Sequence, residues 1–264
     1  MTMIDAKTTV SIVIPLYNEA FAIVELLRRV CSVNLPDWCE GEVIIVDDGS
    51  TDQTMELIRE FVRTGDQRDF RIKIHDSLIN HGKGAALRAG FKMATGEIFL
   101  IQDGDLEYSP ADYPSLLAPF RNENVAIVYG SRFHKGGPKE MKWLNLVANI
   151  VLSRVASLLF GQRITDEATA YKVFRRRVLD HFELHCRGFE FCPEFTGKAM
   201  RAGFSIHEVP IEYNPRGILE GKKIRAIDGV IALFSLIRIR FSRRSRIVKH
   251  PAVAVGQLHS EDRG

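Results

Sequence analysis

The feature that most constrains the fold is the alternation of short apolar runs with segments of helical periodicity. Residues 10–14 and 43–46 are rich in β-branched side chains and contain almost no polar ones, which is typical of parallel strands covered on both faces. Between these runs, Ile23, Leu26, Leu27 and Val30 recur at helical spacing. Because parallel strands need long crossovers, usually helices, this order predicts an α/β fold with a mostly parallel central sheet.

The alternation continues to about residue 213, although the pattern becomes less regular after Gly130. We expect further strands over 72–75, 98–102, 125–129 and 206–213, and further helices over 55–62, 84–94 and 143–160. Ser50 and Gln53 have the spacing of a capping box ahead of the helix over 55–62. The sequence therefore predicts one three-layer α/β/α domain of Rossmann-like type.

Charge is distributed unevenly along the chain. The 264 residues carry a formal net charge of +3, and 26% of them are charged, which excludes a disordered chain. Residues 222–250 hold nine basic residues and one acidic residue. We therefore expect a basic, amphipathic C-terminal extension over 222–264 that meets a local surface partner. A nucleic-acid-binding protein would need broader positive charge, so we expect no nucleic-acid partner.

Cysteine spacing and apolar runs bear on compartment and membrane topology. The four cysteines lack the spacing of a structural zinc site, and residues 1–10 lack the features of a secretory leader, so we expect a reducing cytosol. A membrane span needs about 18–20 apolar residues. The runs over 146–160 and 230–239 are shorter or interrupted, so we expect no spanning helix. We expect 143–160 to pack in the core, with a second contact to a membrane surface as the alternative.

Acidic residues follow three of the predicted strands. Asp47 and Asp48 follow the second strand, and Asp103, Asp105 and Glu107 follow the strand over 98–102. Ligands of open α/β sheets bind outside the carboxyl ends of the strands. Paired carboxylates around a glycine suit a divalent, oxygen-seeking cation. The sequence thus predicts Mg²⁺ or Mn²⁺ bound to a diphosphate, with a capped turn over 48–52 and a solvated loop over 103–107 as the structural alternatives.

The common nucleotide-binding motifs do not fit the chain. No Ser or Thr directly follows Lys83 in Gly82-Lys83-Gly84, and Leu87 occupies the last glycine position of a G-x-G-x-x-G pattern. The sequence therefore supports neither a Walker-type ATPase nor a Rossmann dehydrogenase.

A set of motifs in one order resembles family 2 glycosyltransferases, which have the GT-A fold. The motifs are Pro15-x-Tyr17-Asn18-Glu19, VDDGSTDQT over 46–54, Gly82-Lys83-Gly84 and Asp103-x-Asp105. Later stretches resemble the dolichyl-phosphate mannose synthase branch: Gly130-Ser131-Arg132, Thr165-Asp166, Gly188-Phe189-Glu190, Glu208-Val209-Pro210-Ile211 and Glu220-Gly221-Lys222. The resemblance implies a GT-A domain over 1–221, with 222–264 as a membrane-proximal extension.

The resemblance also implies roles for individual residues. Nucleotide-sugar binding falls to Pro15, Tyr17, Glu19, Asp48, Lys83, Asp103, Gly104 and Asp105. The implied metal ligands are Asp103, Asp105 and Glu107, and the implied catalytic residues are Asp105, Arg132, Arg216 and Lys222. Close relatives place an arginine after the tryptophan of the acceptor helix, where this chain is apolar over 146–148, and Arg154 is the candidate substitute.

The implied activity is inverting transfer of mannose or glucose from GDP-mannose or UDP-glucose to a polyprenyl phosphate, on the cytosolic face of a membrane. Two alternatives stay open. The acceptor could be a saccharide or protein hydroxyl, with Asp166 as general base. Asp166 also has the position of a helix cap before residues 167–174. The chain could instead be a non-catalytic nucleotide-sugar-binding partner of a membrane protein.

Overall fold

The computed structural model describes residues 7–65, 70–133, 141, 143–215 and 226–249. Its centre is a seven-stranded sheet of order β3-β2-β1-β4-β6-β5-β7. The strands are β1 (Thr8–Leu16), β2 (Cys39–Asp47), β3 (Arg71–Asp76), β4 (Ile98–Ile101), β5 (Ile127–Ser131), β6 (Lys172–Arg175) and β7 (Ile206–Pro210). The helices are α1 (Ile23–Ser32), α2 (Thr54–Thr64), α3 (Lys83–Met93), α4 (Tyr113–Leu117), α5 (Trp143–Phe160), α6 (Phe191–Ala202) and α7 (Ala226–Phe241).

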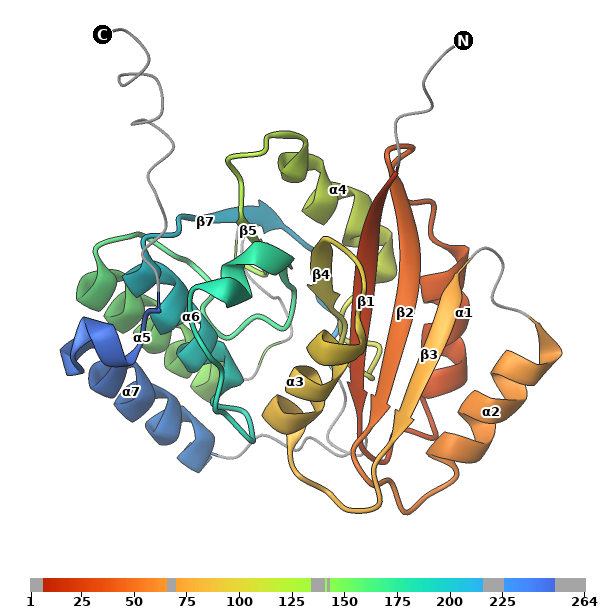
Figure 1. The fold of residues 1–264 in the computed structure, drawn as a ribbon. Helices are drawn as coiled ribbons and strands as arrows, with labels where there is room; N and C mark the ends of the chain where they lie inside the picture. Colours follow the sequence, from red (N-terminus) through yellow and green to blue (C-terminus); the bar gives the residue numbers. More distant parts are fainter. Residues whose placement is uncertain (1–6, 66–69, 134–140, 142, 216–225, 250–264) are drawn as a thin grey trace, which may run out of the picture.

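The sheet is mostly parallel. Strand β1 pairs in parallel with β2 and β4, β2 with β3, and β5 with β7, whereas β6 runs antiparallel to both β4 and β5. Alternate residues of the central strands face opposite layers: Ile12 packs with α1 and α2 on one side, and Val13 packs with α3 on the other (Figure 1). The predicted three-layer α/β/α fold is confirmed.

Two local predictions about helix starts are wrong. The Ser50 hydroxyl donates to Asp47 instead of capping α2, and the Asp52 carboxylate accepts from the backbone N–H of Thr54 at 3.0 Å instead. No helix follows Asp166, because residues 167–168 form a turn and β6 begins at Lys172. Ser50 bonds to Asp47 in the preceding strand, and Asp166 bonds to Arg132, 34 residues earlier. The local spacing of residues reveals neither partner.

Helix α5 forms where the sequence predicts it, but its expected burial in the core is wrong. Only Leu152, Ser153 and Ala156 of its 18 residues are buried. By length and composition alone, the helix is long and apolar enough to cross a membrane. The helix begins at Trp143 and is therefore longer than the run over 146–160 on which the expectation of no spanning helix rested. Figure 1 shows α5 beside α7 and α6 at the end of the molecule away from β3.

Candidate active site

The loops that follow β1 and β2 are joined by hydrogen bonds. Asn18 adopts a left-handed backbone conformation, with φ of 52°, and its backbone N–H donates to the Ser50 hydroxyl at 2.8 Å. Its side-chain oxygen accepts from the backbone N–H of Thr51 at 2.8 Å. Because β1 and β2 are parallel neighbours, these bonds fix two strand-end loops as one unit. That unit carries the predicted nucleoside residues Tyr17 and Glu19, which are partly exposed, whereas Pro15 is buried in β1.

The Asp48 carboxylate anchors the loop ahead of α3. It is 3% exposed, and its two oxygens accept the backbone N–H groups of His81 at 2.9 Å and Gly82 at 2.6 Å. Gly82 has a φ of 95°, and an added Cβ would lie 2.4 Å from the carbonyl oxygen of Arg187. The loop conformation therefore requires glycine. Asp48 thus positions the segment that presents Lys83, and its contact with a nucleoside stays a prediction.

Lys83, the first residue of α3, meets the acidic loop after β4. Its ammonium lies 2.5 Å from a carboxylate oxygen of Asp103, and both side chains are about four-fifths buried. Burial by itself would lower the pKa of Lys83, but the charge and hydrogen bond of Asp103, together with the nearby Cys192 and Glu107, raise it. The backbone carbonyl of Asp103 also accepts from the buried Gln102 amide at 3.0 Å. The structure therefore places a persistent cation beside the predicted donor-binding loop.

Gly104 allows the acidic loop to pack against β1. A Cβ at this position would lie 2.3 Å from Cδ2 of Leu16 and 3.2 Å from Cγ of Glu19. The residues after it stay close to each other: the Glu107 backbone N–H donates to the Asp105 carboxylate at 3.0 Å. Residues 103–107 therefore form a folded turn, and the alternative of a simple solvated loop does not describe it.

The three predicted metal ligands lie on this turn. Among the residues that the structure describes, no three His, Cys, Asp or Glu side chains converge as a ready-made metal cage. Mg²⁺ usually binds one or two carboxylates together with substrate phosphates. Asp103, Asp105 and Glu107 supply carboxylate oxygens and fit binding of a metal ion that is shared with substrate phosphates. They do not form a complete set of protein ligands by themselves. Their roles as metal ligands stay a prediction.

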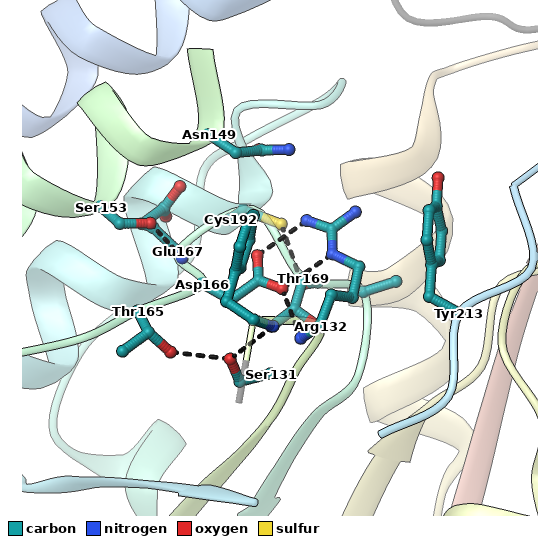
Figure 2. Close-up of polar contacts among 12 residues, drawn as sticks. Ser131, Arg132, Asn149, Ser153, Thr165, Asp166, Glu167, Thr169, Cys192 and Tyr213 are labelled. Carbon is teal, nitrogen blue, oxygen red and sulfur yellow. Dashed lines mark hydrogen bonds and ion pairs between the residues drawn. The ribbon is translucent and has the colours of Figure 1, made fainter. Parts of the chain in front are cut away.

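Arg132 and Asp166 form the second charged centre of the site (Figure 2). The Arg132 Nε and Nη2 groups donate to the two Asp166 oxygens at 2.7 Å each, and the Arg132 backbone N–H donates at 3.0 Å. The guanidinium also lies over the Tyr213 ring, 5.2 Å from its centroid. Burial by itself would lower the pKa of Arg132, but the charge and hydrogen bonds of Asp166, together with Tyr108 and Tyr213, raise it well above its usual range. Arg132 is therefore a fixed cation.

Tyr213 joins this centre to the acidic turn, and sequence reasoning gave it no role. Its hydroxyl donates to the Glu107 carboxylate at 3.2 Å. Burial, and then the nearby Glu107 charge, raise the pKa of Tyr213 to about 12. The short distance in sequence between Tyr213 and the Glu208-Val209-Pro210-Ile211 motif was the signal that could have pointed to Tyr213.

The predicted catalytic residues Arg216 and Lys222 lie outside the described residues.

Glu208 of β7 holds the loop that carries Asp166. Its carboxylate accepts the backbone N–H groups of Thr165 at 2.9 Å and Asp166 at 3.0 Å. The Thr165 hydroxyl lies 2.7 Å from the Ser131 hydroxyl, next to Arg132 (Figure 2). Glu208 thus holds Asp166 directly, and the contact between Thr165 and Ser131 joins the same loop to the end of β5, next to Arg132.

Comparison with known proteins agrees with this geometry. Residues 11–182 match the model of glycosyl transferase family 2. The chain belongs to this family. The matched segment spans β1 through β6, and it contains both the Lys83–Asp103 and the Arg132–Asp166 ion pairs.

Curated relatives of this family 2 chain include transferases named for polyprenyl phosphates. A dolichol-phosphate mannosyltransferase of Pyrococcus furiosus is 29% identical over 223 residues, which are 81% of this chain and 58% of the relative. An undecaprenyl-phosphate 4-deoxy-4-formamido-L-arabinose transferase of an Enterobacter species is 27% identical over 84% of this chain and 64% of the relative. A dodecaprenyl-phosphate galacturonate synthase of Rhizobium johnstonii is 27% identical over 78% and 59%. The chain thus spans about three fifths of these relatives' length.

Solved structures show the same fold as the family 2 chain. Glucosyl-3-phosphoglycerate synthase of Mycobacterium tuberculosis, in complex with UDP, superposes with a TM-score of 0.66 at 18% identity, over 90% of this chain and 80% of that one. A complex of that enzyme with Mn²⁺, UDP and phosphoglyceric acid gives a TM-score of 0.66 at 19% identity, over 89% and 80%. These neighbours have the GT-A fold, as the sequence predicts for this chain.

Proposed function

We propose that the chain is an inverting hexosyltransferase that moves a sugar from a nucleotide-sugar donor to a polyprenyl phosphate. The observation that carries the proposal is the pair of fixed cations at the acidic turn over 103–107: Lys83 pairs with Asp103, and Arg132 lies over Tyr213, whose hydroxyl donates to Glu107. Cations held in this way stabilise negative charge that develops on a diphosphate leaving group. The curated relatives, which are named as transferases for dolichol, undecaprenyl and dodecaprenyl phosphates, support the acceptor class.

The reaction then proceeds by one displacement. An oxygen of the acceptor phosphate attacks the anomeric carbon and forms the new bond. The bond from that carbon to the diphosphate breaks, and the nucleoside diphosphate leaves with the electron pair. The acceptor phosphate is already an anion near neutral pH, so no side chain has to remove a proton. GDP-mannose and UDP-glucose are the proposed donors.

A divalent cation fits the acidic turn. Asp103, Asp105 and Glu107 would hold Mg²⁺ or Mn²⁺, and the bound ion supplies positive charge to the departing diphosphate. Complexes of the fold neighbour with Mn²⁺ and UDP support this choice of ion. Lys83 has a separate task in the proposal, because it compensates the Asp103 charge before the donor binds and faces the donor phosphates afterwards.

The state of Asp166 favours a phosphate acceptor over a hydroxyl acceptor. A general base must reach the proton that it removes, yet both oxygens of Asp166 accept hydrogen bonds from Arg132, and the side chain is fully buried. We infer that Asp166 positions Arg132. The reading as a non-catalytic binding partner is also less favoured, because a binding protein has little need for cations beside the leaving group.

We further propose that α5 and α7 attach the protein to the cytosolic surface of a membrane as a peripheral protein. Val230, Phe234, Ile237 and Phe241 form an exposed apolar stripe on α7, at 38–75% exposure. The exposed arginines Arg238, Arg243 and Arg244 lie on or just after the same helix. An apolar stripe beside basic residues suits an anionic lipid surface. The extension over 222–264 would then be the membrane-proximal part.

The proposal is tested by identifying the product. The protein is incubated with Mg²⁺, labelled GDP-mannose or UDP-glucose, and undecaprenyl or dolichyl phosphate. We expect labelled sugar in the lipid extract, attached to phosphate with inverted anomeric configuration. Label found only in free sugar, or a product of retained configuration, would contradict the proposal.

A further inference from the structure

Four consecutive backbone N–H groups, those of residues 185–188, donate to two carboxylates at the start of α6. Glu194 accepts the first two at 2.9 and 2.6 Å. Glu190 accepts the next two, through one oxygen, at 2.7 and 3.0 Å. Residues 185–188 belong to no helix or strand, so these side chains supply the acceptors that regular structure would otherwise provide. The two glutamates therefore fix the backbone of this segment.

Glu194 is itself held in place from within the protein. The Lys198 ammonium, one turn further along α6, lies 2.5 Å from a Glu194 oxygen and also donates to the carbonyl oxygen of Glu183 at 2.6 Å. Both Glu194 and Lys198 are buried. A buried charge persists only when it is paired and hydrogen-bonded, and both conditions are met here. The segment 185–188 thus has a rigid support.

The other side of the segment faces the start of α3. The carbonyl oxygen of Arg187 accepts the backbone N–H of Ala85 at 3.1 Å. The same N–H also donates to the Gly82 carbonyl oxygen at 2.9 Å, and such shared bonds are common at helix ends. The carbonyl oxygen of Cys186 accepts from the guanidinium of Arg88 at 3.4 Å. The first two turns of α3 are therefore bonded to the segment.

Lys83 lies between two glycines that both pack against this segment. A Cβ added to Gly82 would lie 2.4 Å from a carbonyl oxygen of the segment, and one added to Gly84 would lie 3.0 Å from another. The two backbones thus approach each other with no side chain between them. The Lys83 ammonium meets Asp103 at 2.5 Å. The position of that ammonium therefore depends on where the segment 185–188 lies.

We propose that Glu190 and Glu194 are positioning residues for Lys83. They hold the segment 185–188, the segment sets the first turn of α3, and that turn directs the Lys83 ammonium toward the donor diphosphate. The proposal rests on the proposed function, which assigns Lys83 to the donor phosphates. It also gives a task to the Gly188-Phe189-Glu190 motif, because the side chain of its last residue accepts the backbone N–H of its first.

Binding of a nucleoside diphosphate tests the proposal without any acceptor or turnover. UDP and GDP are titrated in the presence of Mg²⁺, and Glu190 is the residue to change because it is partly exposed. Loss of the buried Glu194 charge would instead leave Lys198 unpaired and destabilise the fold. A group misplaced by about 1 Å can cost up to about 100-fold. We expect Glu190→Ala to raise the Kd for the nucleoside diphosphate by about tenfold.

Two variants separate this effect from a general loss of charge. Glu190→Gln keeps a side-chain oxygen that accepts both N–H groups, so its Kd should stay close to that of the wild type. Glu97→Ala removes an exposed carboxylate ahead of β4, at the opposite end of that strand from Asp103, and should leave the Kd unchanged. An equal rise in Kd for Glu190→Gln and Glu190→Ala would overturn the proposal, because the charge of Glu190 would then act directly.

A double variant tests whether the effect passes through Lys83. If it does, Glu190→Ala should change the Kd little in a Lys83→Met background. A general structural role would weaken binding by the same factor in both backgrounds, and that result would overturn the proposal. Hydrogen exchange of the Ala85 amide gives a second reading. It should be faster in Glu190→Ala than in the wild type, and unchanged exchange would refute the link between the segment and α3.

Failure of the positioning role and failure of the proposed function give different results. If the protein transfers sugar to polyprenyl phosphate and Glu190→Ala does so with an unchanged donor KM, the function stands and the positioning proposal is wrong. If UDP or GDP binding depends on Glu190 and Lys83 as described, but no sugar reaches any polyprenyl phosphate, the positioning role stands and the proposed function is wrong.

Discussion

Arg132 and Asp166 form a buried, bidentate ion pair, with Nε–Oδ2 and Nη2–Oδ1 distances of 2.7 Å. The two residues are 34 positions apart in sequence and come from the end of β5 and the loop before β6. Their geometry fixes the guanidinium over Tyr213 before any ligand arrives. The structure therefore presents Arg132 as a preorganised cation, with Asp166 as its positioning residue.

Disruption of this pair should affect stability and turnover together. Removal of one member of a buried ion pair leaves the other charge uncompensated and typically costs about 3–5 kcal/mol. We expect Asp166→Asn to lower the free energy of unfolding by about 3 kcal/mol, the lower end of this range, because asparagine keeps one acceptor oxygen. Urea unfolding measures this change. The double variant Arg132→Met, Asp166→Asn should be more stable than the sum of the single variants implies, and strict additivity would contradict the coupling.

The acidic turn should be required for metal-dependent transfer but not for folding. We expect Asp105→Asn to reduce kcat by about 100-fold or more, since asparagine can still accept the Glu107 N–H but carries no charge. Calorimetric titration with Mn²⁺ and a nucleoside diphosphate should show weaker metal binding in this variant. Asp37→Asn, at an exposed position before β2, is the control. Full activity of Asp105→Asn, or unchanged metal affinity, would remove Asp105 from the metal site.

A methyl group at position 104 should displace the acidic turn. The added Cβ would lie 2.3 Å from Cδ2 of Leu16, so Gly104→Ala must shift Asp103 and Asp105 relative to β1. We expect the catalytic efficiency to fall by about tenfold or more, with a smaller effect on thermal stability. Gly229→Ala in α7 is a matched control, because nothing lies within 4 Å of its added Cβ. Equal activity of the two alanine variants would show that the turn tolerates displacement.

Attachment to a membrane should depend on both parts of the α7 surface. Each basic residue near an anionic surface strengthens binding by about fivefold, so Arg243→Gln with Arg244→Gln should reduce partition onto phosphatidylglycerol vesicles by more than tenfold. Phe234→Ser with Phe241→Ser should also reduce it, even on neutral vesicles. Phe21→Ser is the control, since Phe21 is 89% exposed on another part of the molecule. Equal partition of all three variants would contradict attachment through α7.

Stability should fall in acid because of the buried carboxylate of Glu42. Burial alone would raise its pKa, but hydrogen bonds from Lys73, Ser11 and Thr95 lower the pKa to about 2. A carboxyl group with a depressed pKa stabilises the fold fully above its ordinary pKa near 4.5, and this contribution is lost as pH falls toward 2. The contribution at neutral pH is about 3 kcal/mol.

Urea unfolding of Glu42→Gln at pH 7 and pH 3 measures this effect. We expect the variant to be less stable than the wild type at pH 7. The difference should shrink at pH 3, because the unfolded wild-type chain binds a proton at Glu42 below pH 4.5 while the folded carboxylate stays mainly ionised. A difference of the same size at both values would show that charge at Glu42 does not contribute.

The sequence was sufficient for six of the seven strands, because local apolar runs specify them. It missed β6 (Lys172–Arg175), because it assigned residues 167–174 to a helix after Asp166. It did not predict the exposure of α5, whose residues are apolar on almost every face, so periodicity cannot tell which face is covered. It also gave Asp166 a local helix-capping role, whereas its actual partner is 34 residues away. The contact of Tyr213 with Glu107 depends on a chain segment more than 100 residues distant, which spacing alone cannot indicate.

The central claim is that sugar is transferred to a phosphate oxygen on a lipid, without a protein base. The most direct test compares initial rates with undecaprenyl phosphate and with undecaprenol, at equal concentration and with the same labelled nucleotide sugar and Mg²⁺. We predict a lipid-linked product with undecaprenyl phosphate and none with undecaprenol. Transfer to undecaprenol at a comparable rate, or to neither lipid while a saccharide hydroxyl is glycosylated, would contradict the account.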